Sequence, residues 1–83
     1  MNAKTFRFED GNELTVEILI GFKVEELNKE YIAYTLNDDN VSDTVKVMIN
    51  EVVYNGDVPE LRGIPEEEKE RVIEIYNGVK NNI

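Results

Sequence analysis

Acidic and amide side chains alternate in one short segment of this chain, and oxygen ligands of this kind bind Ca²⁺ or Mg²⁺. In the segment NDDNVSD, Asp38, Asn40 and Ser42 follow one another at the spacing that opens a calcium-binding loop. The pattern then ends, because its sixth position holds Asp43 in place of glycine and its twelfth holds Ile49 in place of glutamate. We interpret the segment as a solvated loop, with Asp38, Asn40 and Asp43 as candidate ligands of a weakly held cation.

A second group of carboxylates belongs to one predicted helix and consists of Glu66, Glu67, Glu68, Glu70 and Glu74. Two carboxylates can serve as acid and base when one of them is buried. These positions lie away from the apolar residues of the same helix, which predicts a solvent-exposed face that suits the positive end of the helix dipole. The alternative is a carboxylate-based metal-binding protein (Mg²⁺ or Ca²⁺) or a hydrolase that combines these glutamates with Asp38, Asp39 and Asp43.

The remaining residue types argue against catalysis. The 83 residues include no cysteine and no histidine, which removes thiolate chemistry and the commonest general base. Ser42 is the only serine, and no histidine is present to activate it. Phosphate-loop, nucleophile-elbow and dinucleotide motifs are also missing from the sequence. We therefore expect a protein that is not an enzyme and carries no cofactor.

The formal net charge is −9, from eighteen acids and nine bases. Such a surface repels nucleic-acid phosphates and anionic lipid headgroups, whereas a basic protein partner is compatible with it. The acids are scattered from Glu9 to Glu74, which is unlike a row of charges that mimics nucleic acid. No apolar run approaches the length of a membrane helix, and the start of the chain does not resemble a signal peptide. These features predict a cytoplasmic protein.

Alternating apolar residues predict most of the strands. Phe6 and Phe8 belong to a first short strand, and Asp10-Gly11-Asn12 is typical of a hairpin turn. Residues 13–22 alternate most regularly, and residues 30–36 are rich in aromatic and β-branched side chains. The apolar residues that share one face of the second strand are Leu14, Val16, Ile18, Ile20 and Phe22.

A fourth strand is predicted over residues 44–54, with a break in its alternation. Val47 and Ile49 share one face, but Val52 and Tyr54 fall on the other, so we expect a β-bulge near Asn50-Glu51. Asn55-Gly56 is a second turn signal. A short fifth strand over residues 58–61 would contain Pro59, which would confine that strand to an edge.

The last predicted element is an amphipathic helix over residues 65–77, in which Val72, Ile75 and Tyr76 recur at a helical spacing that continues to Val79. Strands followed by one helix predict a single α+β domain over residues 1–83: an antiparallel meander of four or five strands with the helix packed on one face. The apolar face of the second strand is the expected floor for this helix.

The sheet face opposite the helix is a candidate interaction surface, formed by Leu19, Tyr31, Met48, Val52 and Tyr54. Aromatic side chains and Met are enriched at the cores of interfaces, so an uncovered face would bind a protein partner or a second copy. The alternative is that a loop or the C-terminal residues cover this face. The sequence thus predicts a non-enzymatic protein-binding or regulatory module that is a monomer or a weak homodimer.

The order of FEDGNE, EILIGF, KEYIAY, ELRGI and EEEKERVIEIYN resembles the YrzB-like family of small bacterial proteins, a family of unknown function. The similarity covers roughly residues 8–77. It depends on the acidic-Gly turn at residues 9–11, the aromatic Phe22, Tyr31 at the start of a strand and the acidic junction from Ile64 to Val72. The resemblance implies a small acidic bacterial protein, and no activity, cofactor or site residue comes with it.

Overall fold

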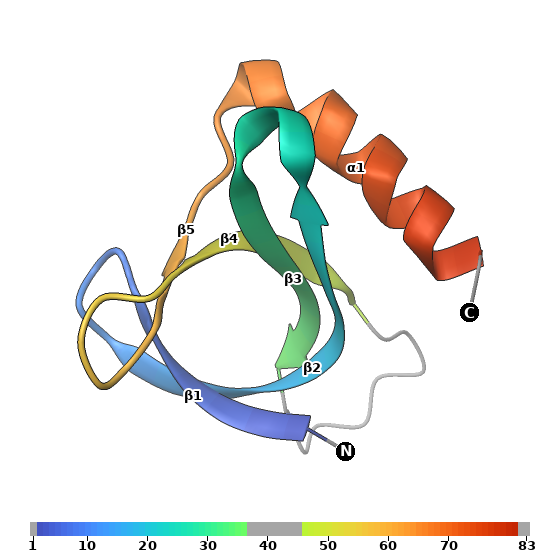
Figure 1. The fold of residues 1–83 in the computed structure, drawn as a ribbon. Coiled ribbons are helices and arrows are strands. Elements are labelled where there is room, and N and C mark those ends of the chain that lie inside the picture. Colours follow the sequence, from blue (N-terminus) through green and yellow to red (C-terminus); the bar gives the residue numbers. More distant parts are fainter. Residues whose placement is uncertain (1, 37–45, 82–83) are drawn as a thin grey trace.

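The computed structural model describes residues 2–36 and 46–81 of the chain. The elements are β1 (Asn2–Phe8), β2 (Glu13–Val24), a 3₁₀ turn η1 (Glu25–Leu27), β3 (Lys29–Leu36), β4 (Met48–Val53), β5 (Glu60–Arg62) and α1 (Glu66–Asn81). Five strands in one sheet and one C-terminal helix confirm the predicted α+β class (Figure 1). The candidate cation ligands Asp38, Asn40 and Asp43, together with Asp39, lie outside the described residues.

The sheet closes into a barrel, a closure that the predicted antiparallel meander did not include (Figure 1). Consecutive strands do pair antiparallel as in a meander, but β5 also pairs with β1, through Arg7 with Glu60 and Phe8 with Leu61. This last pairing is parallel, because the first and fifth strands of an up-and-down meander run in the same direction. Pro59 precedes β5, whose flanks are both paired, so the expected edge position of this strand was wrong.

The interior of the barrel forms the first hydrophobic core. Its buried members are Phe6, Val16, Ile32, Tyr34, Val52 and Leu61, and Phe8, Ile18 and Met48 pack against them. Tyr34 carries the polar end of this core, since its hydroxyl donates to Asn50 Oδ1 at 2.6 Å and Asn50 Nδ2 donates to the Arg62 carbonyl oxygen at 3.0 Å. The interior is therefore filled by side chains whose polar atoms have partners.

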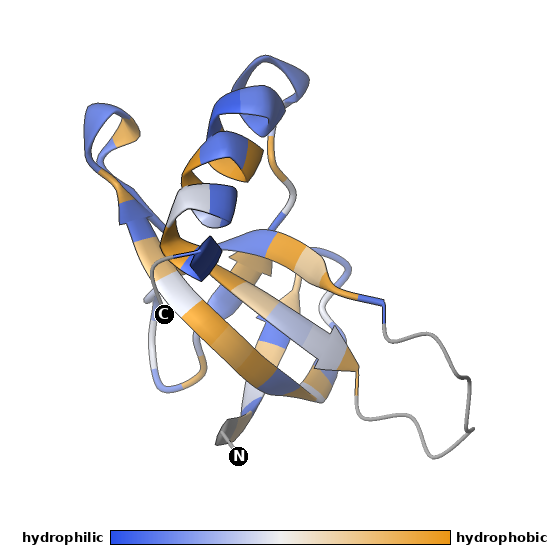
Figure 2. Ribbon diagram, turned by 90° about the vertical axis from the view of Figure 1, so that its right-hand side faces the viewer, coloured by the Kyte–Doolittle hydropathy of each residue, from blue (hydrophilic) through white to orange (hydrophobic). Residues whose placement is uncertain are grey.

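A second core lies between α1 and the outer surface of the barrel. Phe22, Val24, Tyr31 and Val72 are buried there, with a surrounding layer of Ile20, Leu27, Ile49, Ile64, Ile75, Tyr76 and Val79. The apolar side of the helix faces the sheet and its hydrophilic side faces solvent (Figure 2). The helix continues through Asn77 and Gly78 to Asn81, beyond the predicted stop.

A β-bulge in β2 divides its apolar residues between the two cores. Ile18 pairs with Tyr34, but Ile20 pairs with Ala33, so Leu19 is the additional residue between them. Because side chains alternate along a strand, one inserted residue transfers all later side chains to the other face. Val16 and Ile18 consequently point into the barrel, whereas Phe22 and the residues next to it point towards α1.

Two predictions about strand faces were therefore wrong. Of the apolar residues of β2 that were expected to pack under the helix, only Ile20 and Phe22 do so, and Val24 packs beside them. Leu14 is exposed. The bulge expected near Asn50-Glu51 is not present, since β4 pairs with β3 in regular register from Met48 to Val52. Strand β4 has apolar residues on both faces because one face lines the barrel and the other lies under the helix.

Local turn chemistry agrees with the sequence. The β1–β2 turn closes through the Gly11 amide donating to the Phe8 carbonyl at 2.9 Å. Gly11 has φ of +90°, a value that glycine adopts without steric cost, and the Asp10 carboxylate accepts the Asn12 amide at 3.0 Å. Gly56, in the predicted second turn, has φ of +89°.

Candidate functional site

The five residues of the predicted interaction surface do not share one face. Tyr31 lies under α1 with 1% of its surface exposed, while Val52 and Met48 belong to the barrel interior. Leu19 is 46% exposed at the bulge, and Tyr54 is 68% exposed just after β4. The prediction of one shared face was wrong, because it assumed a flat sheet with two faces, whereas the barrel separates an inner from an outer surface.

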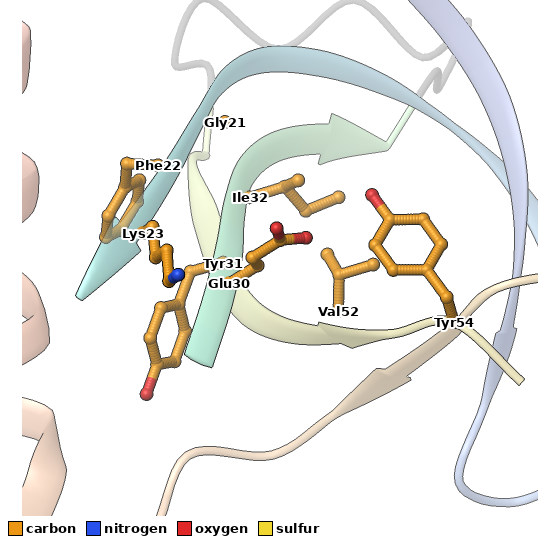
Figure 3. A pocket seen from close by; sticks show the side chains of 8 residues that line it. All are labelled: Gly21, Phe22, Lys23, Glu30, Tyr31, Ile32, Val52 and Tyr54. Atoms are coloured by element: carbon orange, nitrogen blue, oxygen red, sulfur yellow. The ribbon is translucent and has the colours of Figure 1, made fainter. Parts of the chain in front are cut away.

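Tyr54 borders a shallow groove beside the barrel, which we call the Tyr54 groove (Figure 3). It is lined by Gly21, Phe22, Lys23, Glu30, Tyr31, Ile32, Val52 and Tyr54. Ile32 and Val52 point towards the Tyr54 ring in Figure 3, while Phe22 and Tyr31 point to the helix side. The groove has a volume of about 290 Å³ and is open to solvent. Ligand pockets usually measure about 300–1,000 Å³ and enclose their ligand, so this shape suits a contact with a protein surface better.

The strand register places opposite charges across the groove. Lys23 and Glu30 are cross-strand partners in the β2–β3 pair, and both side chains are exposed. Lys23 Nζ lies 3.8 Å from Glu25 Oε2 and so forms its ion pair with Glu25. Among the described residues, Glu30 forms no ion pair, and its carboxylate lies on the wall of the groove. The groove thus combines an exposed aromatic ring, two aliphatic side chains and an acidic group.

A second hollow adjoins the first and shares Lys23, Glu30, Val52 and Tyr54 with it. Lys29 and Glu51 line its other end, where they meet Glu68 of α1. Lys29 Nζ lies 3.0 Å from Glu68 Oε1 and 4.0 Å from Glu51 Oε1. We call Lys29, Glu51, Glu68 and the Tyr31 hydroxyl the helix-anchor cluster.

The electrostatics of the helix-anchor cluster favour a structural role. The pKa of Lys29 is raised, chiefly by its hydrogen bond to Glu68. Desolvation lowers this pKa in part, and the negative charges of the nearby acids raise it further. Burial, followed by the negative charges of Glu68 and Glu51, raises the pKa of Tyr31 to about 12. Its hydroxyl donates to Glu68 Oε1 at 3.4 Å. Lys29 therefore stays protonated and Tyr31 neutral at physiological pH, so neither acts as a base there.

Glu68 differs from its expected position on a solvent-exposed face. Its side chain is mostly buried between α1 and the barrel, whereas Glu66, Glu67, Glu70 and Glu74 are exposed as predicted. Arg71, on the same helix, forms ion pairs with Glu26 of η1 and with Glu74. The helix is consequently held to the barrel by charged contacts at Lys29 and Glu26 as well as by its apolar side.

Within residues 2–36 and 46–81, no group of three or more acidic side chains is arranged to hold a metal ion. In the same part of the chain, no helix is long and apolar enough to cross a membrane. Comparison with protein-family models, curated protein sequences and solved structures gave no match to this chain.

The predicted interaction surface included Tyr31, Val52 and Tyr54 of the Tyr54 groove but missed its other lining residues. Lys23 lies just after one predicted strand and Glu30 begins the next, and their pairing was not predicted because it depends on the register of the two strands. The alternation of Glu30, Ile32 and Tyr34 in the third predicted strand was the available signal, since it places Glu30 and Ile32 on one face.

Proposed function

We propose that this chain is a non-catalytic protein-binding module whose contact surface is the Tyr54 groove and whose partner is a basic protein. The exposure of Tyr54 carries this proposal. Its ring is the most exposed of the large hydrophobic side chains in the described part of the chain, at 68%. Tyrosine combines a large apolar surface with few rotatable bonds, and it is enriched among the residues that dominate binding energy.

The neighbours of Tyr54 support a role in binding. Ile32 and Val52 form an apolar floor whose side chains point towards the ring (Figure 3). Both belong to the packed barrel interior, so the floor is rigid and loses little conformational entropy when a partner binds. An apolar side chain from the partner would bury itself between Tyr54 and this floor.

Charge supports a basic partner. Within the described residues, six of the nine basic side chains form ion pairs with acids of the same chain: Arg7, Lys23, Lys29, Arg62, Lys69 and Arg71. With a net charge of −9, the surface therefore carries a large excess of acids, including Glu30 beside the groove. A negative field of this kind accelerates association with a cationic partner and weakens as salt is added.

Partner capture from a cell lysate tests the proposal through Tyr54→Ser. We expect this variant to capture about tenfold less of the partner than the wild-type chain, since truncating a central aromatic contact costs about 1–2 kcal/mol of binding free energy. Ile73→Ser is the matched control, because Ile73 is also an exposed large hydrophobic residue (49%) but lies on α1. Equal capture by the two variants, or capture that does not weaken between low and moderate salt, would contradict the proposal.

Membership of the YrzB-like family, a cytoplasmic location and a monomeric or weakly dimeric state stay predictions. The residues on which the resemblance depends, the turn at residues 9–11, Phe22 and Tyr31, occupy a hairpin and the second core. None of these positions lends an activity to the chain.

A further inference from the structure

The barrel closes along only a short part of β1. Strand β2 pairs with β1 from Asn2 to Arg7, whereas β5 pairs with β1 only at Arg7 and Phe8. Among residues 2–36 and 46–81, no strand pairs with the remaining edge, from Asn2 to Phe6. We call this segment the β1 edge.

The direction of the backbone groups at the β1 edge follows from neighbouring hydrogen bonds. The Phe8 amide donates to the Asn12 carbonyl and the Phe8 carbonyl accepts from Gly11, so Phe8 bonds on the β2 side. The Arg7 amide donates to the Pro59 carbonyl at 2.9 Å, on the β5 side. Because the backbone groups of an antiparallel strand alternate between its two flanks, the N–H and C=O of Ala3 and Thr5 point outwards.

The side chains at the β1 edge leave room for another strand. Ala3 and Thr5 are small and exposed, and the Thr5 hydroxyl contacts the Thr15 hydroxyl at 2.9 Å on the outer surface of the barrel. Lys4 pairs in register with Val16, so it lies on the inner face, and its side chain is exposed. A lysine that points inward on an edge strand repels unselected apolar strands.

We infer that the β1 edge accepts an extended segment of a partner protein by strand addition, with an acidic side chain of that segment opposite Lys4. The four outward backbone groups of Ala3 and Thr5 supply the main-chain hydrogen bonds, as in other strand-addition complexes. Lys4 supplies the selectivity, because an opposite charge across a strand pair stabilises it and a like charge destabilises it. This segment is acidic at the position opposite Lys4, whereas the partner proposed for the Tyr54 groove is basic. The two places also differ, because Lys4 pairs with Val16, and Val16 precedes the groove residue Phe22 by roughly 20 Å along β2.

The central test replaces Thr5 by proline. The Thr5 N–H points away from β2, so Thr5→Pro removes a donor of the β1 edge without removing a β1–β2 hydrogen bond. Thr5→Ala is the matched control, because it loses the same hydroxyl but keeps the N–H. The probe is a capped peptide of alternating threonine and valine whose central inward-facing residue is glutamate, and its twin carries lysine at that position. Binding is followed by NMR through the amide signals of Ala3 and Thr5.

We expect the glutamate peptide to shift both amide signals and to slow their hydrogen exchange, and to bind about fivefold more tightly than the lysine peptide. Thr5→Pro should abolish this binding and Thr5→Ala should retain it, with both variants folded by the dispersion of their spectra. Lys4→Glu should reverse the preference between the peptides. Tyr54→Ser should leave peptide binding unchanged, which separates this inference from the proposed function.

Three results would overturn the inference. The first is slow exchange of the Ala3 and Thr5 amides in the free protein, which would show that the β1 edge is already covered. The second is equal binding of the two peptides by the wild-type chain. The third is undiminished binding by Thr5→Pro, which would place the peptide elsewhere on the protein.

Discussion

At the scale of single residues, a few polar side chains determine how α1 sits on the barrel. Glu68 accepts hydrogen bonds from Lys29 and from the Tyr31 hydroxyl, and Tyr31 also stacks on Phe22 with ring centroids 5.6 Å apart. Tyr31 therefore belongs to the apolar core through its ring and to the helix-anchor cluster through its hydroxyl. Burial of the hydroxyl, the negative charges of Glu68 and Glu51 and the hydrogen bond to Glu68 all raise its pKa, so the folded protein favours the neutral form of this tyrosine.

This environment predicts a loss of stability at high pH. The pKa of Tyr31 is about 12 in the folded protein, against 10.0 for an ordinary tyrosine. A raised pKa means that the unfolded state loses its proton first, so the stabilisation is complete below pH 10 and is lost as the pH rises towards 12. The raised pKa of Lys29 acts in the same direction.

We expect Tyr31→Phe to flatten the decline in the free energy of unfolding between pH 10 and 12, measured by urea denaturation. Part of the decline should remain, because burial also raises the pKa of Tyr34. Tyr54→Phe is the matched control at an exposed tyrosine and should leave the decline as it is in the wild-type chain. A decline equally steep in Tyr31→Phe and wild type would show that the Tyr31 hydroxyl does not couple to folding.

At the scale of secondary-structure elements, the bulge at Leu19 allows one strand to serve two cores. Before Leu19, the apolar side chains of β2 fill the barrel; after it, they support the helix. A regular β2 would have directed Phe22 and Val24 into the barrel and left α1 without its floor. The inserted residue is therefore a requirement of the fold, and the Leu19 side chain itself is half exposed.

Deletion of Leu19 should therefore be far more damaging than its truncation. We expect the deletion to cost more than about 3 kcal/mol of the free energy of unfolding, since it exchanges buried and exposed faces along the remainder of β2. Leu19→Ala keeps the inserted residue and should cost less than about 1 kcal/mol, because the side chain is exposed. Urea denaturation of both variants measures the difference, and similar stabilities would contradict this account of the bulge.

Local signals in the sequence were sufficient for several elements. Asp10-Gly11 predicted its turn through the conformational freedom of glycine, and the helical spacing of Val72, Ile75, Tyr76 and Val79 predicted the buried side of α1. Barrel closure was not predictable in this way, because it depends on the pairing of Arg7 with Glu60, which are far apart in the sequence. Alternation also reports only that a face is apolar, so the two apolar faces of β4 were misread as a bulge.

The candidate site was predicted less completely than the fold. Tyr54 could be selected as an aromatic residue near a turn, but its separation from Tyr31 and Leu19 depends on the closed barrel. Glu68 was assigned to solvent with its neighbours, because helical spacing does not show how far a long side chain reaches towards the sheet. Its partner Lys29 lies 39 positions away along the chain.

At the scale of the whole molecule, the two cores leave two surfaces of contrasting chemistry. The Tyr54 groove offers an aromatic ring and acidic surroundings, whereas the β1 edge offers backbone hydrogen bonds beside Lys4. Most basic side chains are neutralised within the chain, so the overall field stays negative. A basic partner would therefore be attracted over a long range and then fixed by the apolar contact at Tyr54.

Site-specific photo-crosslinking tests this central claim most directly. With p-benzoylphenylalanine in place of Tyr54, irradiation in a cell lysate should yield one dominant adduct with a basic protein, and the adduct should decrease as salt is raised. The same probe in place of Ile73 should not yield this adduct. An adduct that forms equally from both positions, or one that forms from position 73 alone, would contradict a contact centred on the Tyr54 groove.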